Sequence, residues 1–187
     1  MKFKSSIFFS LLVLTLFSFS CSHSGKPDVN SMTEAQVDHA LGKYLSLDLF
    51  MYVIYPPMNP CGSISINAQN FLQDKQNLVE YWKTKHPKAY KHMEAERAER
   101  ENSYYKALPG KILAYKQQLK TYLDTRIKLY SKQRKTLPTE GKALLDRKIY
   151  FLKQNRDKQL SQVDSFLKHL PETIASAKKK ARESASK

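Results

Sequence analysis

The sequence predicts an all-α protein, an elongated helical bundle with a long C-terminal antiparallel helical hairpin. Three observations support this fold class. Apolar residues recur every three or four positions through most of the chain after residue 30, which is the spacing of an amphipathic helix. Glycine is scarce, with 5 in 187 residues, and hydrophobic residues make up 41%, enough to form a core. Two cysteines are too few for a disulfide-stapled scaffold or a cysteine-rich zinc module.

The first 20 residues are typical of an export signal. Lys2 and Lys4 are followed by the uncharged, apolar stretch 5–20, which is too short for a stable membrane anchor. A small residue, Ser20, stands directly before Cys21 at the end of this stretch. This ending resembles the lipobox of bacterial lipoproteins, in a relaxed form similar to that of spirochaetes, because Ser18 stands where most lipoboxes have Leu.

The lipobox resemblance implies cleavage between Ser20 and Cys21 and attachment of acyl chains such as palmitate to Cys21. It places the protein in the cell envelope, anchored to a membrane by that lipid. Ser22 follows the cysteine in place of an aspartate, which favours the outer membrane. An ordinary secretory signal with Cys21 left as a free thiol is the alternative. The resemblance ends at residue 21 and implies nothing about the fold.

The mature chain divides by composition into three parts. Residues 21–30 form a polar, lipidated tether that we expect to be flexible. The helical domain is predicted over 31–170. Residues 171–187 are rich in lysine, serine and alanine and offer little to pack, so this basic tail is predicted to be disordered.

The first part of the helical domain contains one clear helix start and one clear loop. Ser31 and Glu34 fit a capping box, and a helical pattern follows. The apolar run 49–55 indicates a buried helix end or a buried strand. Two prolines then precede a predicted loop over 58–63, after which Ile64 and Ile66 alternate with serine and hint at a short extended piece.

Two further helices are predicted before the hairpin. An apolar stripe runs from Phe71 to Trp82, and the pair His86–Pro87 ends it. A highly charged helix follows and is predicted to end at Pro109–Gly110.

The hairpin is the most regular part of the sequence. A helix over 111–135 and a turn over 137–141 lead into a second helix that ends near residue 170. The second helix has a nearly continuous seam with the spacing of a coiled coil, formed by Leu145, Ile149, Leu152, Arg156, Leu160, Val163, Leu167 and Leu170.

No catalytic signature is found, so an enzyme is not predicted, and neither a metal site nor a cofactor site is predicted. His92 and Glu96 share a helix face, but no third ligand accompanies them. Cys61 is the one ordinary thiol in the mature chain if Cys21 carries lipid. Cys61 could be buried, could pair between chains, or could be a reactive thiol.

The basic character is concentrated in the C-terminal part, where residues 83–187 hold 27 basic and 11 acidic residues. A lysine stripe is predicted opposite the apolar face of helix 111–135 and consists of Lys116, Lys120, Lys128 and Lys132. Such a stripe suits an anionic glycan, lipid or protein partner, whereas export argues against nucleic acid. There are two alternatives to this interpretation. The lysine stripe could be a solvated face without a partner, or the hairpin could pair through its apolar seam with a second copy or with another envelope protein.

Overall fold

The computed structural model describes residues 28–45 and 56–186 and divides the chain into two compact units, Met1–Met32 and Thr33–Lys187. The first unit contributes the short 3-10 helix η1, Val29–Ser31. All α-helices of the described residues belong to the second unit. The predicted signal with Ser20 and Cys21, and the apolar run 49–55, lie outside the described residues.

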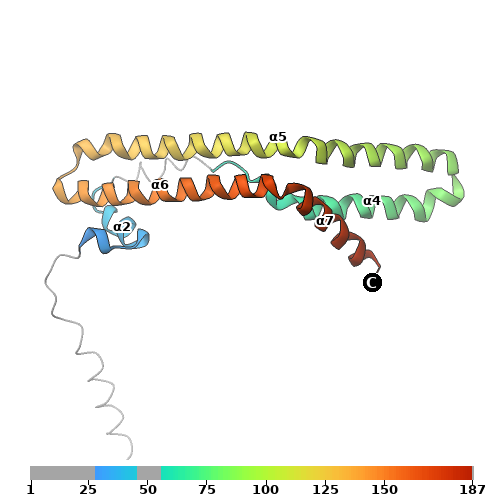
Figure 1. Ribbon diagram of the computed structural model, residues 1–187, viewed down its shortest axis with the longest axis horizontal. Coiled ribbons are helices and arrows are strands. Elements are labelled where there is room, and N and C mark those ends of the chain that lie inside the picture. Colours follow the sequence, from blue (N-terminus) through green and yellow to red (C-terminus); the bar gives the residue numbers. More distant parts are fainter. Residues whose placement is uncertain (1–27, 46–55, 187) are drawn as a thin grey trace, which may run out of the picture. The chain divides into compact units, whose positions relative to one another are not determined.

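The predicted all-α class is confirmed, because the described elements are helical throughout. Two 3-10 turns, η2 (Pro60–Ser63) and η3 (Arg134–Thr136), precede α4 and α6. The α-helices of the described residues, labelled in Figure 1, are α2 (Glu34–Leu41), α4 (Ile64–Lys85), α5 (Pro87–Gln133), α6 (Thr139–Lys168) and α7 (Leu170–Ala185). Within the described residues, no helix is both long and apolar enough to cross a membrane.

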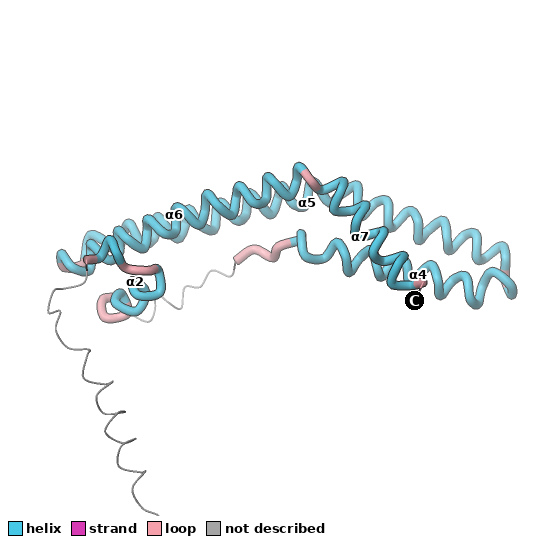
Figure 2. The backbone as a smooth tube through the Cα atoms, turned by 60° about the horizontal axis from the view of Figure 1, so that its bottom comes forward, coloured by secondary structure: helices cyan, strands magenta, loops and turns pink. Residues whose placement is uncertain are grey.

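Helices α4 and α6 both pack along the long helix α5, as Figure 2 also shows. Three ion pairs join α6 to the second half of α5 and to η3, which follows α5 directly. From one pair to the next, the residue number on the α5 side rises by as much as the residue number on α6 falls, so the two segments run in opposite directions. The pairs are Lys116–Asp164, Asp124–Arg156 and Arg134–Asp146. The first half of α5 lies against α4 in the same opposed sense, through Asn67 with Tyr104, Phe71 with Arg97, and Lys75 with Glu94.

The connections between these helices are short. His86 is the single residue between α4 and α5, and Pro87 occupies the first position of α5, where its missing N–H is not needed. The predicted break at this pair is therefore confirmed. The turn η3 and the following Leu137–Pro138 lead from α5 into α6.

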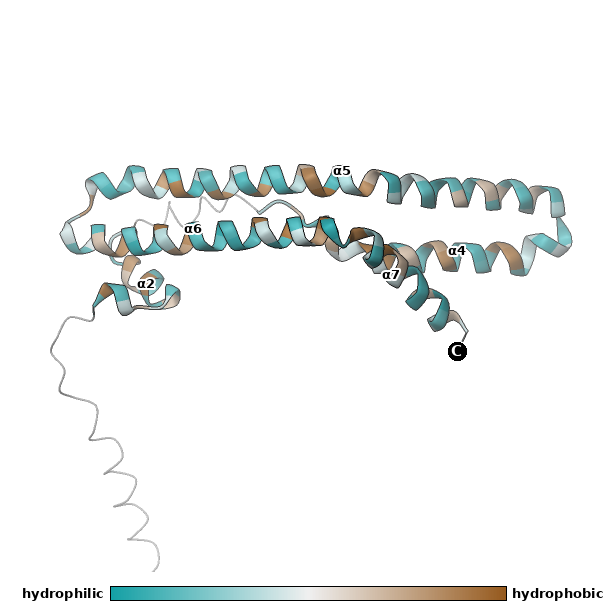
Figure 3. Ribbon diagram, in the orientation of Figure 1, coloured by the Kyte–Doolittle hydropathy of each residue, from teal (hydrophilic) through white to brown (hydrophobic). Residues whose placement is uncertain are grey.

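The main core forms where α4, α5, α6 and α7 meet. Leu108 and Ile112 of α5 are almost completely buried, together with Ile64 of α4. The rest of this core comes from the facing sides of the four helices, where apolar positions lie in Figure 3, and consists of Ala68, Leu119, Leu123, Val163, Leu170, Ala177 and Ala181. Within the seam of α6, Val163 is buried and Leu160 is half-buried against the core.

The predicted helix end at Pro109–Gly110 is wrong, because α5 continues unbroken through both residues. Proline lacks the N–H that would bond the carbonyl four residues earlier, here that of Tyr105, and usually kinks or ends a helix. In α5, Leu108 and Ile112 flank the proline and bury almost their whole surface. The packing of this turn against α4, α6 and α7 outweighs the local preference of the proline.

Two expectations near the start of the domain are also corrected. The capping box is formed by Thr33 and Gln36, two residues later than predicted, with Thr33 Oγ1 accepting from the Gln36 N–H at 3.4 Å. The predicted extended piece at Ile64 is the first turn of α4, and most of the predicted loop is η2. Asn59 caps this turn by accepting the Cys61 N–H at 2.9 Å.

The predicted disordered tail is instead helix α7. Ala177 and Ala181 lie one turn apart and are each 5% exposed, because their small side chains let α7 pack closely on α4. Of the lysines between them, Lys179 and Lys180 are exposed and Lys178 is half-buried toward α5, so a segment with a basic composition still has one apolar stripe. This stripe is hard to recognise in the sequence because alanine is a weak hydrophobic signal.

Candidate functional site

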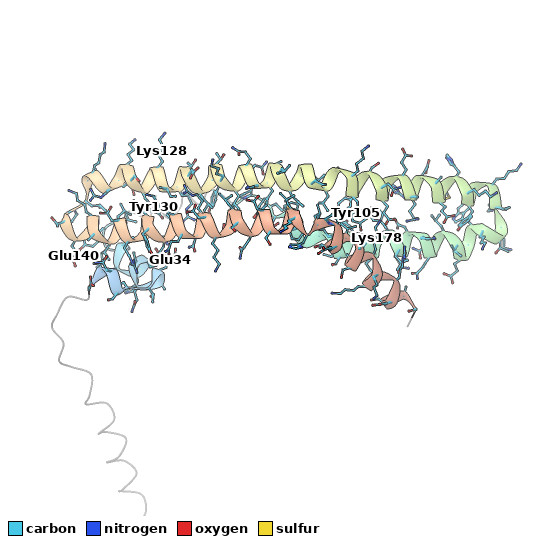
Figure 4. All side chains as sticks on the ribbon, in the orientation of Figure 1. Glu34, Tyr105, Lys128, Tyr130, Glu140 and Lys178 are labelled. Carbon is cyan, nitrogen blue, oxygen red and sulfur yellow. The ribbon has the colours of Figure 1, made fainter. Side chains whose placement is uncertain are left out.

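The predicted lysine stripe is only partly on a free face. Lys116 forms an ion pair with Asp164 of α6, with Nζ 2.5 and 2.7 Å from the two carboxylate oxygens. Lys120, Lys128 and Lys132 are exposed, and Figure 4 shows Lys128 pointing away from α6. Four residues turn a helix by about 40° more than a full circle. A four-residue series therefore drifts from the α6 interface at Lys116 to the outer face at Lys132.

Cys61 lies at the edge of the core in η2, half-buried beside the apolar side chains there. Burial raises the pKa of the Cys61 thiol, which lowers the fraction of nucleophilic thiolate at neutral pH. Burial also raises the pKa of Tyr115, and the nearby Cys61 adds to this shift. The surroundings of Cys61 fit a packing role better than a reactive one.

His92 and Glu96 do share a helix face, with Nε2 and Oε1 3.2 Å apart, and both side chains are exposed. Among the residues that the structure describes, no group of three histidine, cysteine or acidic side chains is arranged to hold a metal ion.

A buried lysine holds α2 against α6. Lys148 of α6 is 6% exposed, and its Nζ lies 2.8 Å from both Glu34 Oε1 and Asp38 Oδ2. Asn155 Nδ2 donates to the second oxygen of Glu34 at 3.2 Å, and Figure 4 shows Glu34 directed from α2 toward α6. With both acids engaged, this cluster is a structural clamp.

The arrangement that most resembles a binding site is a pocket between α4, α5 and α7, with a volume of about 210 Å³. Its apolar side is formed by Ala68, Phe71, Leu72 and Ala181. Its charged side is formed by Lys75, Arg97, Glu101, Lys178 and Arg182. Four cations therefore surround one acid, and the pocket carries an excess of positive charge.

Arg97 is the buried cation of this pocket, with 7% of its surface exposed. Its Nη1 donates to Glu101 Oε2 at 3.0 Å and, more weakly, to the Phe71 carbonyl at 3.4 Å. Its Nε is buried and finds no hydrogen-bond acceptor in the described part of the chain. A buried guanidinium with an unmet N–H is costly, because it has lost water without gaining a partner.

Glu101 links the two cations on either side of it. Burial raises the pKa of Glu101, but the hydrogen bonds from Lys178 and Arg97 outweigh burial and hold it below its ordinary value. Glu101 is therefore ionised at neutral pH. Lys178 Nζ lies 3.0 Å from Glu101 Oε1 and 4.4 Å from the ring centre of Tyr105, and Figure 4 shows these two side chains between α5 and α7.

This pocket is not among the predicted sites, although one feature of the sequence indicates it. Arg97 occupies a position in the apolar stripe of its helix, where Tyr104 and Leu108 follow on the same face. A charged residue at such a position indicates a buried or paired group. Lys178 and Arg182 lie in the segment 171–187 that is predicted to be disordered, so their approach to Arg97 could not be predicted.

Comparisons with known proteins found no matching family model, no matching curated protein and no matching solved structure.

Proposed function

We propose that this protein is a lipid-anchored, non-enzymatic component of the cell envelope that binds an anionic partner through exposed lysines of α5. The observation that carries the proposal is the unpaired charge of Lys120, Lys128 and Lys132. All three are exposed, and none forms an ion pair with an acid in the described residues. Their charge is therefore available to a partner.

The spacing of these lysines favours an acidic glycan over a single headgroup. Lys120 and Lys132 are 12 positions apart, which corresponds to about 18 Å along the helix. Lys120 and Lys132 also differ by about 120° around the helix axis, so a flexible polymer that winds partly around α5 can contact all three lysines at once, and it releases counterions when it does so. The lipid on Cys21 would hold the protein where such glycans occur, and this element rests on the lipobox resemblance alone.

The alternative in which the hairpin seam pairs with another chain has less support. Leu119, Leu123, Leu145 and Val163 are already buried within the chain, where α5 and α6 pack on their neighbours. The least supported alternative, an enzyme that uses Cys61, is disfavoured by the raised pKa of that thiol.

Binding of heparin, used as a probe polyanion, and of anionic vesicles by the full chain in non-ionic detergent tests the proposal. Replacing Lys120, Lys128 and Lys132 together by glutamine should weaken heparin binding at least about tenfold, and binding by the wild type should fall steeply with salt. The matched control replaces the exposed lysines Lys83 and Lys85 at the end of α4 and Lys88 at the start of α5, which removes the same charge far from the second half of α5.

Equal weakening in the control would mean that net charge alone drives binding and would refute a role for the α5 lysines. Stronger binding to vesicles than to heparin would refute the glycan. The anchor is tested separately, since Cys21→Ala should move the protein from the detergent phase to the aqueous phase. Retention of the variant in the detergent phase would refute lipidation at Cys21.

A further inference from the structure

We propose that the pocket between α4, α5 and α7 is a binding site for a phosphate-type oxyanion, with Arg97 as its central ligand. This site goes beyond the proposed function, because it uses other cations, on α4, α7 and the first half of α5, than the exposed lysines in the second half of α5. The proposal rests on three features of the pocket: an unsatisfied buried guanidinium, an uncompensated positive charge, and a size that suits a small anion.

The unsatisfied edge of Arg97 is the edge that arginine uses to hold oxyanions. The Nε and Nη2 groups of a guanidinium form a planar fork that matches two oxygens of a carboxylate or phosphate. Arg134 of the same chain uses this edge to hold Asp146, with Nε and Nη2 2.6 and 2.9 Å from its two oxygens. In Arg97 the hydrogen bonds to protein come from Nη1, and Nε has no acceptor in the described residues. Arg97 lines the pocket, but Nε itself is covered by protein atoms, so a shift of the side chain that opens this edge to the pocket would let an oxyanion supply the missing acceptor.

The charge of the pocket favours a phosphate over a monovalent carboxylate. Glu101 is ionised and already engaged by Arg97 and Lys178, so it neutralises one of the four lining cations. Lys75 forms a longer contact of 3.6 Å with Glu94, and Arg182 has no ion pair among the described residues. The remaining excess charge suits an anion with close to two negative charges, as phosphate carries near neutral pH.

The size of the pocket limits the ligand. A volume of about 210 Å³ holds several water molecules but is below the usual range for a drug-sized ligand. Phe71 and Leu72 line the apolar side and would exclude water from one side of a bound ion, which strengthens the attraction to Arg97. A free phosphate ion or the phosphate group of a small ester therefore fits the space.

The experiment measures binding of inorganic phosphate to the full chain in non-ionic detergent by calorimetry and by the shift of the thermal midpoint, at constant ionic strength. The wild type should bind phosphate at millimolar or lower concentration, and its thermal midpoint should rise as phosphate is added. Arg182→Gln should weaken binding about tenfold or more, since one charged donor at the pocket is lost. Arg182 is exposed and makes no hydrogen bond within the described residues, so its replacement should leave the fold intact.

The matched control is Lys180→Gln, which removes the same charge from an exposed position on the same helix but outside the pocket. This variant should bind phosphate like the wild type. Arg97→Lys keeps the charge but removes the fork and should also bind about tenfold more weakly. If Arg97→Lys fails to fold, the comparison of Arg182→Gln with Lys180→Gln still decides the question.

Three outcomes would overturn the proposal. They are no binding of phosphate by the wild type at about 10 mM, equal weakening in Arg182→Gln and Lys180→Gln, and tighter binding of acetate than of phosphate. Glycerol phosphate identifies the source of the ligand, because tighter binding than that of the free ion supports a phosphate ester, and equal or weaker binding supports the free ion. Failure here would leave heparin binding by the α5 lysines unaffected, so the two proposals can fail separately.

Discussion

Replacing Lys148 by methionine should release α2 from α6 while leaving the rest of the bundle folded. Methionine has nearly the same length as lysine and keeps the apolar contacts of the side-chain stem, so the change mainly removes the ammonium group. That group is within 2.8 Å of both Glu34 and Asp38. After the replacement, two carboxylates face each other on α2 without their shared cation.

The expected loss is about 2 kcal/mol for the docking of α2. A hydrogen bond to a charged group contributes about 1.5 to 3 kcal/mol when it is shielded from water. The side chains of Glu34 and Asp38 are 37% and 42% exposed, so water partly replaces the lost lysine, and exposed ion pairs contribute only about 0 to 1 kcal/mol. The Lys148 side chain itself is 8% exposed, which places the pair between these limits.

Hydrogen exchange of the α2 amides is the direct assay, because α2 can open without global unfolding. A loss of about 2 kcal/mol should accelerate exchange at Val37 and Leu41, which are buried in the docked helix, by about thirtyfold. Lys153→Met, at an exposed position on the same helix, is the control and should change nothing. Wild-type exchange rates in Lys148→Met, or equal acceleration in the control, would refute the clamp.

The same clamp should depend on pH. The hydrogen bond from Lys148 holds the pKa of Glu34 below its ordinary value of 4.5 in the folded chain. Its contribution to docking is therefore present above that ordinary value and is lost as the pH falls through the lower folded pKa. Burial lowers the pKa of Lys148, but the hydrogen bonds to Asp38 and Glu34 outweigh burial and raise it, so the contribution of the lysine is lost only in strong alkali. In Lys148→Met, the acid-induced loss of α2 protection should be absent or much smaller.

Three further predictions concern the corrected elements and the thiol. Pro109→Ala should raise the free energy of unfolding by about 1 to 3 kcal/mol, seen as a higher urea midpoint, because an alanine N–H can bond the Tyr105 carbonyl. A lower midpoint would mean that the proline stabilises α5. Ala177→Asp should detach α7 by placing a charge in a buried contact, seen as fast amide exchange confined to α7; unchanged exchange would mean that α7 does not depend on this contact. Cys61 should react with a thiol reagent at pH 7 much more slowly than a free cysteine, and an equal rate would contradict its burial.

The sequence was sufficient for the fold class because an amphipathic helix is a local pattern. The break at His86–Pro87 and the seam that includes Val163 could be predicted from residues within one or two turns of each other. Pro109 could not be predicted correctly, because its effect depends on how strongly the neighbouring Leu108 is packed by helices distant in sequence. Local propensity favoured a helix end, and tertiary packing prevented it.

The clamp and the pocket depend on contacts between distant parts of the chain. Lys148 meets Glu34 from 114 positions away, and no spacing rule relates the two. Arg97 offered a partial signal, since a charged residue at an apolar position indicates a buried group, but its neighbours on α7 could not be inferred. The lysine stripe was only partly correct because helical drift carries Lys116 into the interface with α6.

The short connections at both ends of α5 have a consequence for the order of folding. Helix α5 is joined to α4 through the single residue His86 and to α6 through a short turn. Each of these two helix pairs can therefore form with only a short loop to close. Chain regions that are near in sequence meet early, because they lose little loop entropy before their contacts form. Helices α2 and α7 dock on partners much farther away along the chain, so we infer that both arrive last, and the phosphate pocket is completed only when α7 does.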